Sequence, residues 1–120
     1  MRKSHALIVG LFISAWPLNA GERLKMGVSP AVAFAPATVR VRATVEVNPE
    51  NRAIQIVAES PEFYRSSEIP LDGEHAPRTT IVEFRSLPGG AYIVTAVLIR
   101  VKDRTTASQQ LNVMGRRVAE

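Results

Sequence analysis

The stretch that decides the fold runs from Arg85 to Leu98 and reads "RSLPGGAYIVTAVL". It joins a proline-glycine corner to a long run of apolar and β-branched residues, which favour β-strands. Successive side chains of a strand point to opposite faces, and between Tyr92 and Ile99 both faces are apolar except for Thr95. A strand that is apolar on both faces is typical of the centre of a sheet. We therefore expect residues 91–101 to form a central strand that starts beside Tyr92.

A second clear strand covers residues 38–47, which read "TVRVRATVEV". Its alternation places Val39, Val41, Ala43, Val45 and Val47 on one face, and Arg40, Arg42, Thr44 and Glu46 on the other. Residues 48–51, "NPEN", end this strand because proline lacks the ladder donor and asparagine favours turns. The alternation resumes in residues 52–60, where Ile54, Ile56 and Ala58 share a face. The two strands are predicted to form a hairpin with a short polar loop.

Three further runs complete the pattern. Residues 79–87 alternate as a strand that places Thr80, Val82 and Phe84 on one face. Residues 105–113 form another, with one face made of Ala107, Gln109, Leu111 and Val113. Residues 60–69 allow either a helical turn after Pro61 or a short strand that ends at Pro70, and we favour the strand. The count predicts an all-β fold, a six- to seven-stranded antiparallel β-sandwich, with a small barrel as the other arrangement that this spacing allows.

The motif "LPGGAYIV", residues 87–94, resembles a motif of immunoglobulin-like and fibronectin type III-like sandwiches. It is also similar to carboxypeptidase-regulatory-like and Cna-B-type modules of bacterial exported proteins. The resemblance implies that Leu87 seals the end of the core, that Pro88, Gly89 and Gly90 form the turn, and that the Tyr92 hydroxyl bonds to upstream backbone. The core tryptophan and the disulfide of antibody domains are missing, since the single Trp16 lies near the N-terminus and the chain has no cysteine.

The N-terminus reads as an export signal. Arg2 and Lys3 precede an apolar run from Ala6 to Trp16, and small residues follow up to Ala20. The run is too short to span a bilayer, so no stable membrane span is expected after processing. We expect a signal peptide over residues 1–20, cleaved after Ala20 or alternatively after Ala35, and an exported protein of the periplasm or the cell exterior. The domain boundaries that follow are a flexible leader 21–37, an immunoglobulin-like sandwich 38–113 and a C-terminal tail 114–120.

The residues that would support catalysis are scarce. The chain has no cysteine, and His75 is the one histidine after residue 20, so neither a metal site nor a cofactor site is predicted. No glycine-rich phosphate loop and no nucleophile motif is present. Removing residues 1–20 leaves thirteen basic and eleven acidic side chains, interleaved along the chain, which speaks against nucleic acid as a partner. The sequence therefore predicts a protein that is not an enzyme.

The best binding candidates are Phe63, Tyr64 and Arg65. Adjacent aromatics of a strand point to opposite faces, so one ring can fill the core while the other meets solvent, and an exposed tyrosine beside arginine is a common interface anchor. An unpaired strand edge is a second route to a partner. We expect a structural or protein-interaction module of the cell envelope whose partner is another envelope or secreted protein. A carbohydrate- or small-ligand-binding module is the alternative, and no oligomeric state is predicted.

Overall fold

The computed structural model describes residues 23–115, which form an all-β protein of eight strands with almost no helix. One short 3₁₀ turn, Gly73–His75, follows the fifth strand. The strands are β1 (Leu24–Ser29), β2 (Val32–Phe34), β3 (Ala37–Val45), β4 (Asn51–Ser60), β5 (Phe63–Pro70), β6 (Thr79–Leu87), β7 (Gly90–Arg100) and β8 (Arg104–Met114). The sequence-based prediction of an all-β fold is confirmed at this level.

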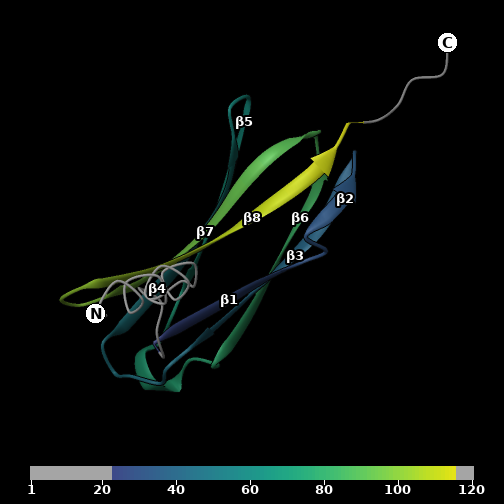
Figure 1. Cartoon of the computed structure of the whole chain (residues 1–120). Helices are drawn as coiled ribbons and strands as arrows, with labels where there is room; N and C mark the ends of the chain where they lie inside the picture. Colours follow the sequence, from purple (N-terminus) through teal and green to yellow (C-terminus); the bar gives the residue numbers. More distant parts are fainter. Residues whose placement is uncertain (1–22, 116–120) are drawn as a thin grey trace, which may run out of the picture.

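The strands make two sheets that face one another in a sandwich-like arrangement (Figure 1). The first sheet has three strands in the order β1-β3-β6, and the second has five in the order β2-β8-β7-β4-β5. All neighbours are antiparallel except β2 and β8, which run parallel. As the sequence predicts, β7 is a central strand, because it pairs with β4 on one side and β8 on the other.

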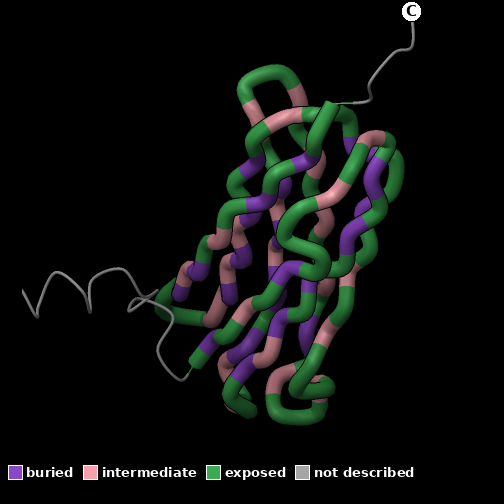
Figure 2. Tube along the Cα trace, turned by 45° about the vertical axis from the view of Figure 1, so that its right-hand side comes forward, coloured by how far each residue is buried: buried purple, intermediate pink, exposed green. Residues whose placement is uncertain are grey.

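The core lies between the sheets and is made by the inward residues of each strand. Buried and exposed residues alternate along the strands, as the period of two requires (Figure 2). The residues buried to 2 % exposure or less include Leu24, Val39, Val41, Ile54, Ile56, Leu87, Tyr92, Val94, Leu98 and Leu111. The predicted outward residues of β3, among them Arg40 and Arg42, are exposed. Val47 is expected on the inward face but is exposed, since β3 ends at Val45.

The predicted hairpin between residues 38–47 and 52–60 is wrong. β3 pairs with β1 and β6, whereas β4 pairs with β5 and β7, so the two strands belong to different sheets. The loop 46–50 carries the chain across the sandwich, and the Asn51 side-chain amide anchors it by donating to the Glu46 carbonyl at 2.9 Å. A short polar loop is equally suited to a hairpin and to a crossing between sheets, so alternation alone does not identify the partner strand.

The structure differs from the sequence-based expectation of a flexible leader over residues 21–37. Residues 24–29 form β1 at the edge of the three-stranded sheet, and residues 32–34 form β2 at the edge of the five-stranded sheet. Leu24 and Val28 of β1 are buried in the core. Gln109 of β8, an inward polar residue, accepts a hydrogen bond from the Val28 amide at 3.3 Å and so ties β1 to the other sheet. The sandwich therefore begins at residue 24 rather than 38.

The predicted signal peptide, residues 1–20, lies outside the described residues. Of the predicted tail, residues 114–120, the structure describes Met114, which ends β8, and Gly115. Within residues 23–115 no helix is long and apolar enough to cross a membrane.

Candidate interaction surface

The corner between β6 and β7 is closed by Tyr92. Its ring is 1 % exposed, and its hydroxyl donates a hydrogen bond to the carbonyl of Pro88 at 2.7 Å. The Phe63 ring packs edge-on against it, with ring centroids 6.2 Å apart. Burial raises the pKa of the Tyr92 hydroxyl, while the nearby Ser60 side chain and the Arg65 charge act to lower it. The net direction is upward, so the hydroxyl stays protonated and able to donate at neutral pH. Tyr92 therefore holds the corner together and offers no exposed reactive group.

The rest of the corner is equally structural. Leu87 is fully buried where β6 ends. A Cβ built on Gly89 would lie 2.8 Å from the Cα of Gly115, so only glycine fits where the corner passes the end of β8. Gly90 opens β7, and a Cβ there would stand 3.4 Å from the Ser60 side chain. The small side chains at 89 and 90 thus reflect close packing of the corner against its neighbours.

The three binding candidates lie at the start of β5, but the structure separates them. Phe63 faces inward and packs against the core, while Tyr64 faces outward and is 59 % exposed. The guanidinium of Arg65 stacks on the Phe63 ring, 5.0 Å from its centroid, and donates to the carbonyl of Arg85 in β6. Arg65 therefore links β5 to the other sheet, and Tyr64 is the member of the trio that a partner can reach.

The backbone of β5 has a free edge. β5 is the last strand of its sheet and pairs only with β4. The Leu71 amide just after β5 donates to the Arg52 carbonyl at 2.8 Å, and hydrogen bonding alternates along an antiparallel pair. The odd-numbered residues of β5 therefore bond to β4, whereas Tyr64, Ser66 and Glu68 direct their N–H and C=O groups away from it.

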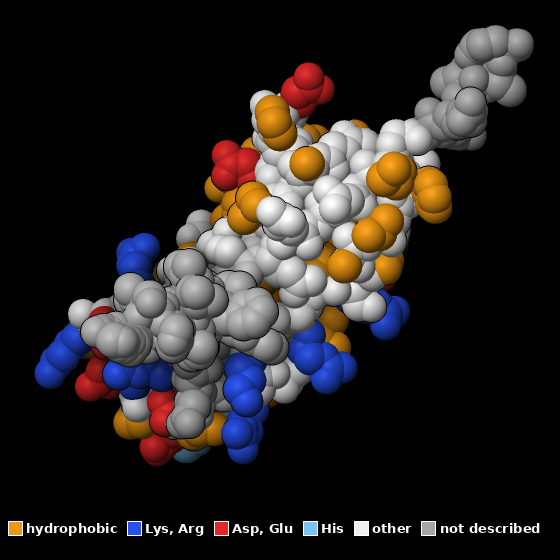
Figure 3. Space-filling view, in the orientation of Figure 1, with side chains coloured by type: hydrophobic (Ala, Val, Ile, Leu, Met, Phe, Trp, Pro, Cys, Tyr) orange, Lys and Arg blue, Asp and Glu red, His pale blue; other side chains and the backbone are white. Residues whose placement is uncertain are grey.

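The outward side chains beside this edge are mostly uncharged. Tyr64 lies opposite Glu59 of β4, and Glu59 in turn lies opposite Ile93 of β7. The Ile93 side chain is 46 % exposed. In the space-filling view, hydrophobic side chains gather in the upper half of the molecule, toward the end where the labels of β2 and β5 stand, while most Lys and Arg side chains lie below (Figure 3). We call the free edge of β5 at Tyr64, Ser66 and Glu68, with Glu59 and Ile93 beside it, the β5 surface.

The sequence did not identify Ser66 or Ile93 as part of a surface. The signal for Ile93 was present, since residues 91–101 carry a second apolar face with Ile93, Val97 and Ile99. That face points outward from the five-stranded sheet and remains partly exposed in the described residues. For Ser66 the sequence holds no signal, because the free edge arises from the strand order.

The remaining candidates for chemistry are dispersed. His75 lies in the 3₁₀ turn, beside a shallow hollow of about 350 Å³ that Pro49, Arg52 and Asp72 also line. Among residues 23–115, no three side chains of His, Cys, Asp or Glu lie close enough to hold a metal ion together.

Comparisons with known proteins identify the fold and no family. No protein-family profile and no curated protein matches the sequence. Two structures of superoxide reductase (neelaredoxin) from Ignicoccus hospitalis are similar to this chain, each at 14 % identity. The first has a TM-score of 0.62 and covers 77 % of this chain and 80 % of its own. The second has a TM-score of 0.63 and covers 78 % of this chain and 82 % of its own. The sulfur carrier protein SoxY from Chlorobium limicola f thiosulfatophilum matches with a TM-score of 0.56 at 15 % identity, over 76 % of this chain and 78 % of its own.

These similarities correct the sequence-based prediction that the protein is not an enzyme. That prediction took a small β-sandwich without a recognisable motif as the mark of a non-catalytic module, but a superoxide reductase, which is an enzyme, has a similar fold. Fold and function are separable, since one architecture supports catalysis in one protein and other roles elsewhere. The similarity to SoxY and to the reductases supports a sandwich-like all-β fold for this chain.

Proposed function

We propose that this protein is an exported interaction module that binds an extended segment of another envelope or secreted protein at the β5 surface. The observation that carries the proposal is the combination of an unpaired strand edge with an exposed Tyr64 side chain on the same strand. An extended peptide can add to such an edge through main-chain hydrogen bonds, and pockets for its alternate side chains give selectivity. Tyrosine is common among the residues that dominate binding energy at interfaces.

The β5 edge fits this role better than the edges of β1 and β2. On the outer edge of β1, the Val28 N–H already donates to the Gln109 side chain and is not free for a partner strand. β2 is only three residues long. β5 spans eight residues and ends at Pro70, which lacks the N–H that would extend pairing further. Natural proteins protect such edges with charged side chains, above all lysine, with proline or with a covering loop. Residues 63–69 of β5 contain neither lysine nor proline, and their charged members are Glu68 and Arg65, which is engaged with the Phe63 ring and the Arg85 carbonyl.

Ser66→Pro tests the proposal. The substitution removes an N–H that points away from β4, so the sandwich keeps its own ladder, because proline is tolerated at such positions of edge strands. A photocrosslinking amino acid placed at Glu68 is expected to capture one protein partner in cells that export the chain. Adding Ser66→Pro is expected to lower the yield of that adduct about tenfold, since a partner carbonyl loses its donor.

Ser66→Ala is the matched control, because it changes the same side chain and keeps the N–H. It is expected to leave the adduct yield unchanged, and circular dichroism should show that both variants are folded. An adduct that survives Ser66→Pro at full yield would contradict strand addition at β5. Retention of the protein on glycans, with no protein adduct at Glu68, would favour the alternative of a carbohydrate-binding module.

Export is part of the same proposal, and the structure bears on the cleavage site. Cleavage after Ala35 would remove β1 and β2, including Leu24 and Val28 of the core, whereas cleavage after Ala20 would leave both strands intact. We therefore expect the exported protein to begin at Gly21, which N-terminal sequencing of the secreted or periplasmic fraction would test. An N-terminus at Met1 would refute the signal peptide, and one at Pro36 would refute the role given to β1.

We further propose that the sandwich is of the immunoglobulin-like type. Its support is the corner between β6 of one sheet and β7 of the other, where the Tyr92 hydroxyl bonds to backbone four residues upstream. A tyrosine at this place, near the start of the strand after the corner, is characteristic of immunoglobulin-like sandwiches.

A further inference from the structure

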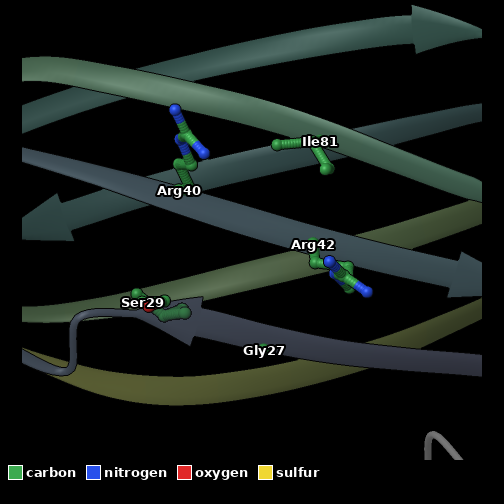
Figure 4. A pocket seen from close by; sticks show the side chains of 6 residues that line it. Gly27, Ser29, Arg40, Arg42 and Ile81 are labelled. Carbon is green, nitrogen blue, oxygen red and sulfur yellow. The ribbon is translucent and has the colours of Figure 1, made fainter.

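The outer face of the three-stranded sheet contains a hollow of about 320 Å³ on the side of the sandwich opposite the five-stranded sheet. It is lined by Gly27, Val28 and Ser29 of β1, Arg40 and Arg42 of β3, and Ile81 of β6. Figure 4 shows the two arginine side chains rising from neighbouring outward positions of β3, with Gly27 and Ser29 on the strand beside them. We call this feature the Gly27 hollow.

Gly27 leaves room in the hollow that a side chain would fill, and neither close packing nor a left-handed backbone requires a glycine there. Its φ is outside the left-handed region, and a Cβ built on it would meet no atom within 4 Å. A glycine inside a strand weakens the strand, and it often marks a place where a ligand or another backbone approaches closely. The unfilled position lies directly opposite Arg42 in the β1–β3 pair.

The charges around the hollow are unbalanced. The three strands of this sheet carry four basic side chains (Lys25, Arg40, Arg42 and Arg85) and one acidic side chain, Glu83, for a net charge of +3. Glu83 is held by Arg85 at 2.9 Å and lies only 3.8 Å from Arg40. Arg42 makes no ion pair with any carboxylate among the described residues. The hollow thus offers an uncompensated guanidinium next to a partly compensated one.

We propose that the Gly27 hollow binds an acidic segment of a protein, with one carboxylate seated between Arg42 and Arg40. Planar guanidinium groups recognise carboxylates through paired, charge-assisted hydrogen bonds. The Ser29 hydroxyl lies at the same rim and can donate a further bond, and Ile81, 53 % exposed, offers apolar contact to a neighbouring side chain. The absence of a side chain at Gly27 lets the backbone of the segment approach β1.

A peptide fits this face better than a saccharide. No aromatic side chain lines the hollow, so no stacking platform for a sugar ring is present there. This site lies on a different sheet from the β5 surface, and the proposal does not rest on strand addition at β5. The two proposals can therefore fail separately.

The test is a titration of the folded protein with a synthetic peptide of alternating Glu and Thr. Amide chemical shifts locate the binding site, and calorimetry measures the affinity. The peptide is expected to shift the Gly27 and Arg42 resonances, with an affinity that falls as salt is added. Arg42→Gln is expected to weaken binding about tenfold, since a charge-assisted pair is lost. Gly27→Thr is expected to weaken it to a similar extent by filling the hollow, without lowering the melting temperature.

Each change has a matched control on another part of the chain. Arg104→Gln makes the same change in net charge at an exposed position of β8, and Gly115→Thr adds a side chain at another glycine whose Cβ would meet open space. Both are expected to bind the peptide as the wild-type protein does, and so is Ser66→Pro. A peptide of alternating Gln and Thr is expected not to bind.

Four results would overturn the proposal. The first is that the Glu peptide binds the Gly27→Thr variant and the Arg42→Gln variant as tightly as the wild-type protein. The second is that the Gln peptide binds the wild-type protein as tightly as the Glu peptide does. The third is saturable binding of oligogalacturonate at Gly27 without binding of the Glu peptide, which would assign the hollow to an acidic saccharide. A protein that binds neither anion at low salt would likewise refute an anion site.

Discussion

Leu87→Ala is expected to lower the free energy of unfolding by about 2–5 kcal/mol, the largest loss among the changes considered for this protein. Leu87 is fully buried at the end of β6, pairs with Ala37 of β3 and belongs to the main core cluster. The rigid corner that follows, closed by the Tyr92 hydrogen bond to Pro88, restricts how far the backbone can collapse into the space that the substitution leaves. Urea denaturation of both proteins would measure the difference, because the free energy of unfolding falls linearly with denaturant.

Val101→Ala provides the comparison for this loss. Val101 is exposed in the turn after β7, so its truncation is expected to change the free energy of unfolding by no more than about 0.5 kcal/mol. A Leu87→Ala loss as small as that of Val101→Ala would show that Leu87 does not seal the core.

Tyr92→Phe is expected to cost about 0.5–1.5 kcal/mol of stability, the usual net contribution of one hydrogen bond, because the Pro88 residue that accepts it is exposed. The substitution keeps the aromatic ring against Phe63, and it removes the hydroxyl that donates to the Pro88 carbonyl at 2.7 Å. The cost arises because a carbonyl at the corner loses its protein donor. Thermal and urea unfolding of the two proteins at neutral pH would measure it.

Tyr64→Phe is the matched control, since it removes the same hydroxyl from an exposed tyrosine and is expected to leave stability nearly unchanged. Alkaline pH gives a second readout. Burial raises the Tyr92 pKa above its unfolded value of about 10, so its contribution to stability is intact below about pH 10 and is lost as the pH rises through the folded pKa. This part of the alkaline loss should be missing in Tyr92→Phe. Equal alkaline curves for the two proteins would contradict the buried donor.

The sequence predicts those parts of the fold that local alternation encodes. The inward face of β3 follows directly from its alternation, and so does the division of β7 into two faces. The Tyr92 corner follows from the resemblance of residues 87–94 to a motif of immunoglobulin-like sandwiches, because the hydroxyl and its acceptor lie within that local motif. β1 and β2 were missed because they are short and are interrupted by Pro30 and Pro36, so no sustained period is visible. The pairing of β3 was mistaken because alternation reports the buried face of a strand and carries no information on its neighbour.

The candidate sites show the same division between local and long-range information. The opposite orientations of Phe63 and Tyr64 follow from their adjacency in a strand. The position of Arg65 does not, because its guanidinium reaches a carbonyl of β6 twenty residues away. The Gly27 hollow also depends on long-range pairing, since β3 brings β1 and β6 together on its two sides.

The parallel pairing of β2 with β8 has a mechanical consequence. These strands lie toward opposite ends of the described chain and are joined by backbone hydrogen bonds, Ala35 N–H to Met114 C=O at 2.9 Å and Asn112 N–H to Ala31 C=O at 3.0 Å. Tension applied between the two ends of the chain pulls parallel strands in opposite directions along their length. The bonds between them then carry the load together, in shear, instead of opening one after another as in a zipper. A module built in this way resists stretching where force enters from the C-terminal side, because the end of β8 lies in this parallel pair.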